Sequence, residues 1–482
     1  MPADGDGFRR FVRVRNPYGP ANRTTIRMKV FGSSGTRGVA NEELTPKFAL
    51  KVSQAAGEVW DVDRVGVARD TRTTGRMLAD AVASGLSSVG PDVDRLGVVP
   101  TPGAQSYAEH EGVPIVMVTA SHNPPEYNGL KLIGDDGTEL AVEELERVEK
   151  RILASKFDPA SWDEVGRVRH VEGVREAYVD ELETRVDREK IANADLTVAL
   201  DPGHGAGALT SPEFFRELGC RVVTVNAQPD GHFPGRDPEP IEDNLADLGQ
   251  LVRATDADVG IAHDGDADRA IFYDETGEYV EGDATLAALA AAELDADDTT
   301  VSAVNVSQRL VDVCNDVGAD LELTPIGSTN IITRIRELWD EGVSVPIAGE
   351  GNGGIFYPED HRLNRDGAYV GARFLELLAD RPASEIVAPY DGYHNVRTNV
   401  EYDDEGERET MLEAVEEYAT DADADLTTID GFRLDYGDAW VLARPSGTEP
   451  LVRVYAEAHD EGRARDLCDE VTAVVEAARD GN

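Results

Sequence analysis

Short apolar runs that end in polar loops recur along the chain. A short apolar run bounded by Gly, Pro and Asp is typical of a buried strand, and an apolar residue at every third or fourth position is typical of a helix. Strand, loop and helix alternate here, which predicts an α/β fold that binds ligands at the carboxyl ends of its strands. The runs are residues 64–68, 114–118, 196–200, 258–262 and 343–348, and clear helical spacing covers residues 140–153 and 212–218.

The segment after about residue 388 has a different pattern. Strand-like stretches predominate there, and they are separated by one acidic helix and followed by a closing helix. This order predicts a smaller α+β unit. The expected strands are residues 393–400, 439–443 and 451–456, and the expected helices are residues 409–418 and 461–478.

A chain of 482 residues is longer than one hydrophobic core usually supports, so several domains are expected. The first 27 residues contain six Arg and no apolar periodicity, which favours a non-native or mobile extension with Met28 as the true start. The predicted division is 1–27 extension, 28–156 first α/β domain, 157–278 second, 279–382 third, and 383–482 C-terminal domain.

Charge adds a second line of inference. Asp and Glu number 94 against 46 Lys and Arg, the net charge is −48, and only seven of the basic residues are Lys. Acid spread along the whole chain with Lys nearly absent resembles proteins of salt-loving cytoplasms, where high salt screens self-repulsion. The same charge repels polyanions, so we expect neither a nucleic-acid nor an anionic-membrane partner.

Cys220, Cys314 and Cys468 stand far apart, which supports neither a zinc site nor a disulfide framework. No run approaches the roughly 18 apolar residues of a membrane span, and no secretory segment follows the first Arg residues. We therefore expect reduced thiols and a cytoplasmic protein.

The strongest local signal is residues 119–131, TASHNPPEYNGLK. Ser121 follows a predicted buried strand and precedes a Pro-stiffened turn, so it is held at the ligand edge of the sheet. Such a Ser acts as a nucleophile or phosphoryl carrier when charge is supplied nearby. A Ser in an ordinary helix-capping turn is the structural alternative.

Three carboxylates at alternate positions form the second signal: Asp264, Asp266 and Asp268 in the loop DGDADR. Carboxylate oxygens that converge on one point suit a hard cation such as Mg²⁺. A solvated acidic turn is the alternative.

Three further loops carry groups suited to a sugar phosphate. Hydroxyls, backbone N–H groups and guanidinium forks in RPSGTEP and at Arg453 could hold a phosphate dianion, although a hairpin turn explains the string as well. Glu and Asn on GEGNGG suit sugar hydroxyls, and Arg in GSSGTRG suits phosphate charge. The candidate residues are Arg37, Glu350, Asn352, Arg444, Ser446, Gly447, Thr448 and Arg453.

Together and in this order, TASHNPPEYNGLK, DGDADR and RPSGTEP resemble the α-D-phosphohexomutase family of phosphoglucomutases, phosphomannomutases and phosphoglucosamine mutases, from about Lys29 to the C-terminus. The resemblance implies four domains around a central cleft: three α/β units, each with a mixed sheet between helices, and a C-terminal domain like the TATA-binding protein. It also implies a phosphorylated Ser121 that shuttles a phosphoryl group between hexose oxygens through a hexose 1,6-bisphosphate. That bisphosphate would serve as intermediate and activator.

The resemblance implies roles for individual residues too. One Mg²⁺ per subunit would be held by Asp264, Asp266, Asp268 and phosphoserine 121, while Arg37 and Arg269 would neutralise phosphoryl charge. A proton must leave the attacking hydroxyl, for which His122 and Lys131 are candidates; the family places the matching Lys in that role. The GEGNGG and RPSGTEP loops would hold the sugar and the phosphate that is not transferred.

Sugar choice and oligomeric state, monomer or homodimer, stay open. Many bacterial members carry Ser and His where this chain has Asn352 and Gly354, and the present version looks like archaeal members, several of them phosphoglucosamine mutases. This favours glucosamine phosphate slightly over mannose or glucose phosphate. Two other functions compete: an aspartate-dependent sugar phosphatase that uses Asp264, and a catalytically silent sugar-phosphate-binding protein.

Overall fold

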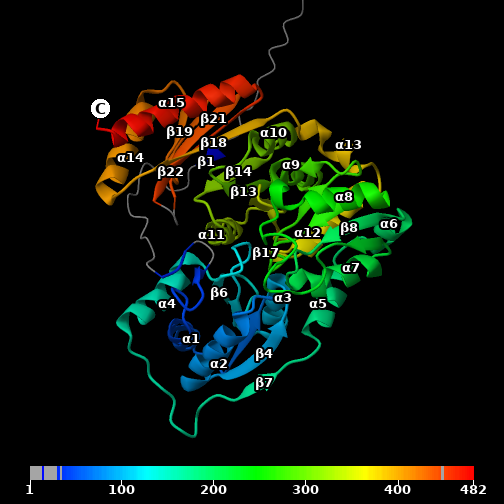
Figure 1. Cartoon of the computed structure of the whole chain (residues 1–482), viewed down its shortest axis with the longest axis vertical. Coiled ribbons are helices and arrows are strands. Elements are labelled where there is room, and N and C mark those ends of the chain that lie inside the picture. The colour runs from blue at the N-terminus through cyan, green and yellow to red at the C-terminus, as the bar shows by residue number, and fades with distance from the viewer. Residues whose placement is uncertain (1–13, 16–29, 33–34, 447–449, 482) are drawn as a thin grey trace, which may run out of the picture.

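The computed structural model describes residues 14–15, 30–32, 35–446 and 450–481. They form four sheets with helices around them, arranged as four units in Figure 1. The α/β architecture followed by a smaller α+β unit is therefore confirmed. Most of the proposed extension, and Met28 itself, lies outside the described residues; within it, β1 (Val14–Arg15) pairs in parallel with β14 (Asp320–Thr324).

The first unit, blue to cyan in Figure 1, contains a mixed six-stranded sheet in the order β2-β6-β5-β3-β4-β7. Strands β3, β4, β5 and β7 are parallel; β6 runs against them, and the edge strand β2, antiparallel to β6, runs in their direction again. Its strands are β2 (Thr36–Val39), β3 (Arg64–Arg69), β4 (Asp92–Val98), β5 (Ile115–Val118), β6 (Tyr127–Ile133) and β7 (Val168–His170), and its helices are α1 (Pro46–Trp60), α2 (Gly75–Ser88), α3 (Thr101–Glu111) and α4 (Val142–Ala154).

The second unit has a five-stranded mixed sheet in the order β12-β11-β10-β8-β9. Strand β7 lies in the first sheet, so the chain joins this unit only after His170. The strands are β8 (Thr197–Asp201), β9 (Arg221–Thr224), β10 (Val259–Ala262), β11 (Ile271–Tyr273) and β12 (Tyr279–Val280), and the helices are α5 (Val174–Glu183), α6 (Arg188–Asn193), η1 (Ala206–Leu209), α7 (Ser211–Glu217), η2 (Glu242–Asn244) and α8 (Ala246–Thr255).

The third unit carries the sheet β1-β14-β13-β15-β16-β17. The strand expected at residues 343–348 begins only at Ala348, because Pro346 has no N–H to donate to a ladder. The remaining strands are β13 (Thr299–Ala303), β15 (Ala348–Glu350), β16 (Gly354–Tyr357) and β17 (Arg362–Arg365), and the helices are α9 (Gly282–Glu293), α10 (Gln308–Val317), α11 (Ser328–Asp340), α12 (Gly367–Leu378), α13 (Ala383–Val387) and η3 (Ala388–Tyr390).

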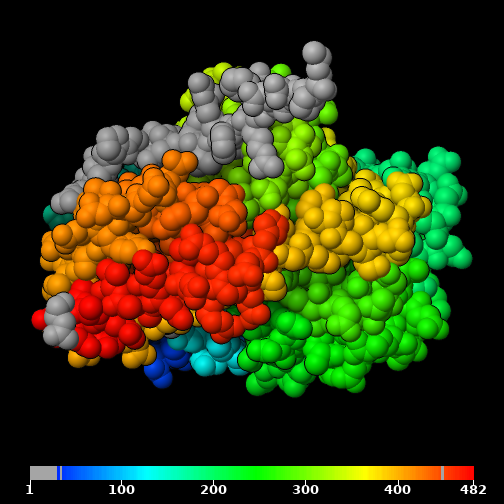
Figure 2. All heavy atoms as spheres, turned by 90° about the horizontal axis from the view of Figure 1, so that it is seen from above, coloured from blue at the N-terminus to red at the C-terminus, as the bar shows by residue number. Residues whose placement is uncertain are grey.

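The fourth unit has an antiparallel sheet in the order β18-β22-β21-β20-β19, covered by two helices. In Figure 2 this unit, orange to red, forms a lobe beside the yellow and green residues of the third. Its strands are β18 (His394–Glu401), β19 (Asp425–Thr427), β20 (Phe432–Asp435), β21 (Ala439–Pro445) and β22 (Leu451–Ala458), and its helices are α14 (Glu405–Asp421) and α15 (Glu461–Arg479).

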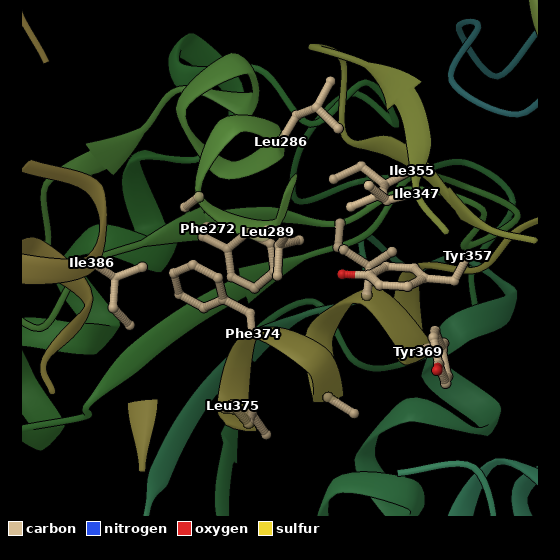
Figure 3. Packing of buried hydrophobic residues seen from close by; sticks show 14 of the residues in the cluster. Phe272, Leu286, Leu289, Ile347, Ile355, Tyr357, Tyr369, Phe374, Leu375 and Ile386 are labelled. Carbon is tan, nitrogen blue, oxygen red and sulfur yellow. The ribbon is translucent and has the colours of Figure 1, made fainter. Parts of the chain in front are cut away.

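The second and third units share one hydrophobic core. Phe272 of β11 and Phe374 of α12 lie with ring centroids 4.3 Å apart near the middle of this core, as Figure 3 shows. Each such ring contributes about 1.5–3 kcal/mol when it is fully buried. Ile386 of α13 belongs to the same core, although the predicted boundary at residue 382 assigns α13 to the last unit. The first and fourth units have separate cores.

Among the described residues, no helix is both long and apolar enough to cross a membrane. The three cysteines are free and buried, as the sequence predicted.

Candidate active site

Ser121 occupies the loop that follows β5, and its side chain is completely buried. Its φ is +52°, a left-handed conformation that a non-glycine residue adopts only when its surroundings fix it. The Thr119 hydroxyl accepts the Ser121 N–H at 2.9 Å, and the Ser121 hydroxyl donates to Asp264 at 2.5 Å. The Ser that the sequence selected is therefore held rigidly against the acidic loop of the second unit.

The guanidinium of Arg72 holds the loop that carries Ser121. This side chain is buried and pairs with the buried carboxylate of Asp70, at 3.1 Å between Nε and Oδ2. Its two terminal nitrogens donate to four carbonyl groups of the loop at 2.5–2.9 Å, so they align the backbone around Ser121. The four accepting residues are Ser121, Asn123, Pro124 and Tyr127.

The carboxylates of Asp264, Asp266 and Asp268 form a buried cluster directly after β10. Oxygen atoms of all three lie within 4.8 Å of one another, and the Oδ1 atom of each has no hydrogen-bond partner among the described residues. Gly265 lets the loop approach closely, because a Cβ there would lie 2.6 Å from the Ser121 carbonyl oxygen. Burial, with Asp268 and Asp266 nearby, raises the pKa of Asp264 to about 8.

A hard divalent cation fits this cluster. Buried carboxylates with free oxygens repel one another, and a cation that binds them removes both the repulsion and the unsatisfied acceptors. Oxygen-only ligands favour Mg²⁺ or Ca²⁺ over softer metals. The cluster could therefore hold one metal ion beside the Ser121 hydroxyl.

Two cations lie on the other side of the same carboxylates. Lys131 on β6 is 1% exposed, and its Nζ lies 3.1 Å from Asp266 and 2.8 Å from Asp268. Arg365, at the end of β17, donates to Asp268 at 2.6 Å. Burial acts to lower the pKa of Lys131, but the carboxylates of Asp266, Asp268 and Glu139 hold it above its usual value. In this arrangement the ammonium is charged.

His122 lies next to the Ser121 hydroxyl and contacts Arg269. Arg269 donates to Nδ1 of His122 at 2.9 Å, and the same nitrogen lies 3.4 Å from the Ser121 Oγ. Burial and the positive charges of Arg269 and Arg37 lower the pKa of His122, so the imidazole is neutral. Arg37 on β2 is positioned by a hydrogen bond of 2.8 Å to Asn123.

The GEGNGG loop lies between β15 and β16. Glu350 is buried and Asn352 is exposed, with 3.5 Å between the Asn352 Nδ2 and a Glu350 oxygen. Gly354 leaves space that Arg365 fills, because a Cβ at Gly354 would meet the Arg365 Cδ at 2.7 Å. The absence of a side chain at Gly354 thus makes room for the side chain of Arg365 from the neighbouring strand β17.

The fourth unit contributes a pair of guanidiniums. Arg444 on β21 and Arg453 on β22 are direct cross-strand partners. Like charges placed opposite one another are destabilising unless an anion lies between them. Asp430 lies 3.0 Å from Arg444 and compensates part of this charge. Ser446 is buried at the end of β21, and Gly447 and Thr448 lie outside the described residues.

Four residues that contact this site were not predicted from the sequence. Arg72, Arg365 and Thr101 each act on a partner far away along the chain; Thr101, for example, donates to Asp266 at 2.6 Å. Glu139 lies 3.6 Å from Lys131 and 4.0 Å from Arg365, and accepts a hydrogen bond from Ser328 at 3.0 Å. The string ARDTR after a predicted strand was the only local hint, and it points to Arg72 alone.

Four family models match the chain in order. They are described as phosphoglucomutase/phosphomannomutase alpha/beta/alpha domain I for residues 28–159, domain II for residues 176–277, domain III for residues 281–393, and the C-terminal domain for residues 398–474. Together the four matches cover most of the chain.

Whole-length relatives agree with these models. A phosphoglucomutase/phosphomannomutase of Thermococcus kodakarensis is 40% identical over 463 residues, 94% of this chain and all of the relative. A probable phosphoglucosamine mutase of Methanopyrus kandleri is 42% identical over 452 residues, 93% of this chain and 98% of the relative. The crystal structure of a phosphoglucomutase/phosphomannomutase family protein from Burkholderia thailandensis, 28% identical, superposes with a TM-score of 0.81 over 93% of this chain and 97% of its own.

Proposed function

The chain belongs to the phosphoglucomutase/phosphomannomutase family, and from this premise we propose how its residues interconvert hexose 6-phosphate and hexose 1-phosphate. The enzyme is an isomerase, a phosphohexomutase. One observation supports the assignment of roles above all: the buried Ser121 hydroxyl lies 2.5 Å from a carboxylate oxygen of a three-Asp cluster.

Ser121 is the phosphoryl carrier. In the first step the bond between phosphorus and Ser121 Oγ breaks, a bond to a sugar hydroxyl oxygen forms, and the proton of that hydroxyl leaves. The product is a hexose 1,6-bisphosphate. After the bisphosphate turns over, Ser121 Oγ accepts the other phosphoryl group and the departing sugar oxygen takes up a proton, so that atoms and charge balance.

One Mg²⁺ per subunit is assigned to Asp264, Asp266 and Asp268, with an oxygen of phosphoserine 121. When bound, it supplies positive charge that neutralises the phosphoryl oxygens. The Oδ1 atoms of the three Asp residues, which have no hydrogen-bond partner among the described residues, support this assignment. Arg37 and Arg269, which flank the Ser121 loop, add charge of the same sign.

Lys131 is proposed to exchange the proton with the sugar hydroxyl. Asp266 and Asp268 hold its ammonium form, which can donate a proton to the departing sugar oxygen, whereas uptake of the proton from the attacking hydroxyl requires the neutral amine. His122 is proposed as a neutral hydrogen-bond acceptor from Arg269 rather than a proton carrier.

Glu350 and Asn352 are proposed to bind the sugar hydroxyls, and the RPSGTEP loop with Arg453 to bind the phosphate that is not transferred. The cross-strand register of Arg444 and Arg453 supports an anion at that position. Gly447 and Thr448 complete the proposed loop by sequence, together with Ser446.

Glucosamine phosphate is the proposed substrate, with mannose and glucose phosphates as close alternatives. The probable phosphoglucosamine mutase among the relatives supports this order. Sugar phosphates are the only partners proposed. The protein is proposed to be a monomer or a homodimer and to act in the cytoplasm.

We also propose unit boundaries near residues 170, 280 and 391, because β7 belongs to the first sheet and α13 to the core of the second and third units.

A mutase assay in multimolar KCl with Mg²⁺ and a hexose bisphosphate primer tests the proposal. The 1-phosphates of glucosamine, mannose and glucose are run in parallel, and the ratio of kcat/KM values ranks them. Formation of a 6-phosphate from at least one of them is expected. Release of inorganic phosphate instead would support the phosphatase, and binding without turnover would support the silent binder.

A further inference from the structure

A cavity of about 270 Å³ lies in the first unit, and none of the residues assigned above lines it. It is bounded by the end of β3, by β4, by the first turns of α2 and by the edge strand β7, all of which lie at the lower end of the molecule in Figure 1. The charged or titratable residues in its wall are Arg69, Arg76, Asp80, Arg95 and His170.

Positive charge dominates this cavity, in a chain with 94 acidic and 46 basic residues. Its only carboxylate, Asp80, pairs with Arg95 at 2.5 Å. For Arg69 and Arg76, no carboxylate oxygen of the described residues lies within 4.0 Å of a guanidinium nitrogen. Arg69 donates only to the backbone carbonyl of Asp70, at 3.0 Å. Two guanidiniums are thus left without an ion pair.

The Arg69 side chain is half-buried, whereas Arg76 is exposed. Burial of Arg69, together with the nearby positive charge of Arg76, lowers the pKa of its guanidinium, although Asp70 acts in the opposite direction. In the same wall, the Nε of Arg95 is buried and has no hydrogen-bond partner among the described residues. A buried donor without an acceptor costs about 1–3 kcal/mol. An anion in the cavity would accept from such donors and neutralise the excess charge.

We propose that this cavity binds the phosphate group of a small molecule at a site separate from the active site. Guanidinium groups match a phosphate geometrically, since each presents two parallel N–H donors. The volume admits a phosphate or diphosphate group. A neighbouring hollow shares Gly97 with the cavity and is lined by apolar residues and by the charged side chains of Glu172, Arg175 and Glu176.

Titration calorimetry with inorganic pyrophosphate tests this site. The active site is filled beforehand with excess glucose 1,6-bisphosphate, and KCl is kept at the lowest concentration at which the protein stays folded. One binding site for pyrophosphate is expected to remain. Arg76→Gln should weaken binding at this site about tenfold, the equivalent of about 1.4 kcal/mol, because one charge-assisted contact is lost.

Arg147→Gln is the matched control: Arg147 is an exposed helical Arg of the same unit, and its loss changes the net charge equally. This variant should bind pyrophosphate like the wild type. The proposal is overturned if the wild type binds none beside the bisphosphate, if Arg76→Gln binds equally well, or if both variants weaken to the same extent. Mutase activity is measured separately on all three proteins, so failure of this site and failure of the proposed function are distinguishable.

Discussion

The hydroxyl of Ser121 and the carboxylate of Asp264 lie 2.5 Å apart although 143 residues separate them in the chain. One comes from the first unit and the other from the second, so the docking of two separate sheets brings the two side chains together. Both lie beyond the carboxyl ends of parallel strands, where α/β proteins place their ligands.

Replacement of Ser121 by Ala should abolish covalent phosphorylation and lower kcat by several orders of magnitude, because the carrier oxygen is lost. Intact-mass spectrometry and the mutase assay provide the two measurements. Ser84→Ala on the exposed side of α2 serves as control and should behave like the wild type. A Ser121→Ala enzyme with more than about a hundredth of the wild-type rate would show that another group carries the phosphoryl.

Replacement of Asp266 by Asn should abolish magnesium dependence together with activity, since one of three converging carboxylates loses its charge. Chelation of the metal by EDTA should inactivate the wild type reversibly. Magnesium binding can be followed directly by calorimetry, with Asp135→Asn in an exposed loop as the control. Unchanged magnesium affinity in Asp266→Asn would remove the cluster from consideration as the metal site.

Arg72→Lys keeps a positive charge beside Asp70 but cannot reach all four loop carbonyls. We expect kcat to fall while KM changes little, because Ser121 loses its fixed orientation but the sugar contacts are untouched. The free energy of unfolding should fall by about 2–4 kcal/mol, as for other broken buried networks. Urea unfolding and steady-state kinetics measure the two effects. Arg76→Lys, at the exposed start of the neighbouring helix, is the control. If it lowers kcat and the free energy of unfolding as much as Arg72→Lys does, Arg72 has no specific role in holding the loop.

Asp283 gives a testable dependence of stability on pH. Its carboxylate packs against Gly351 in the GEGNGG loop, where a Cβ would lie 2.2 Å from an oxygen. Burial, with a contribution from Glu457, raises the pKa of Asp283 to about 7, whereas an unfolded Asp titrates near 3.9. Between these values the folded protein binds more protons, so this carboxyl lowers the free energy of unfolding as pH rises through the window. The other charged groups around it are Glu281, Arg309 and Arg397.

Asp283→Asn should therefore melt at a higher temperature than the wild type at about pH 8, and the difference should shrink toward about pH 5. One unit of pKa shift corresponds to about 1.4 kcal/mol. Differential scanning calorimetry at a series of pH values measures it. A difference in melting temperature that does not change with pH would disprove the link to this carboxyl.

The sequence predicted those parts of the site that are encoded in short strings. Ser121 and the three Asp residues each follow an apolar run, so their place at the sheet edge could be inferred locally. The contact of Arg365 with Asp268 spans 97 residues and depends on how the third unit docks, which no local pattern reports. The left-handed φ of Ser121 was equally hidden, because Arg72, not a glycine, imposes it.

The common core of the second and third units limits how the enzyme can be recombined. Because Phe272 and Phe374 pack against each other across that junction, a chimaera that takes only the third unit from a relative would set two unmatched surfaces face to face. A graft intended to change the GEGNGG loop should carry the second unit with it. The GEGNGG loop and the acidic loop would then be inherited as one block.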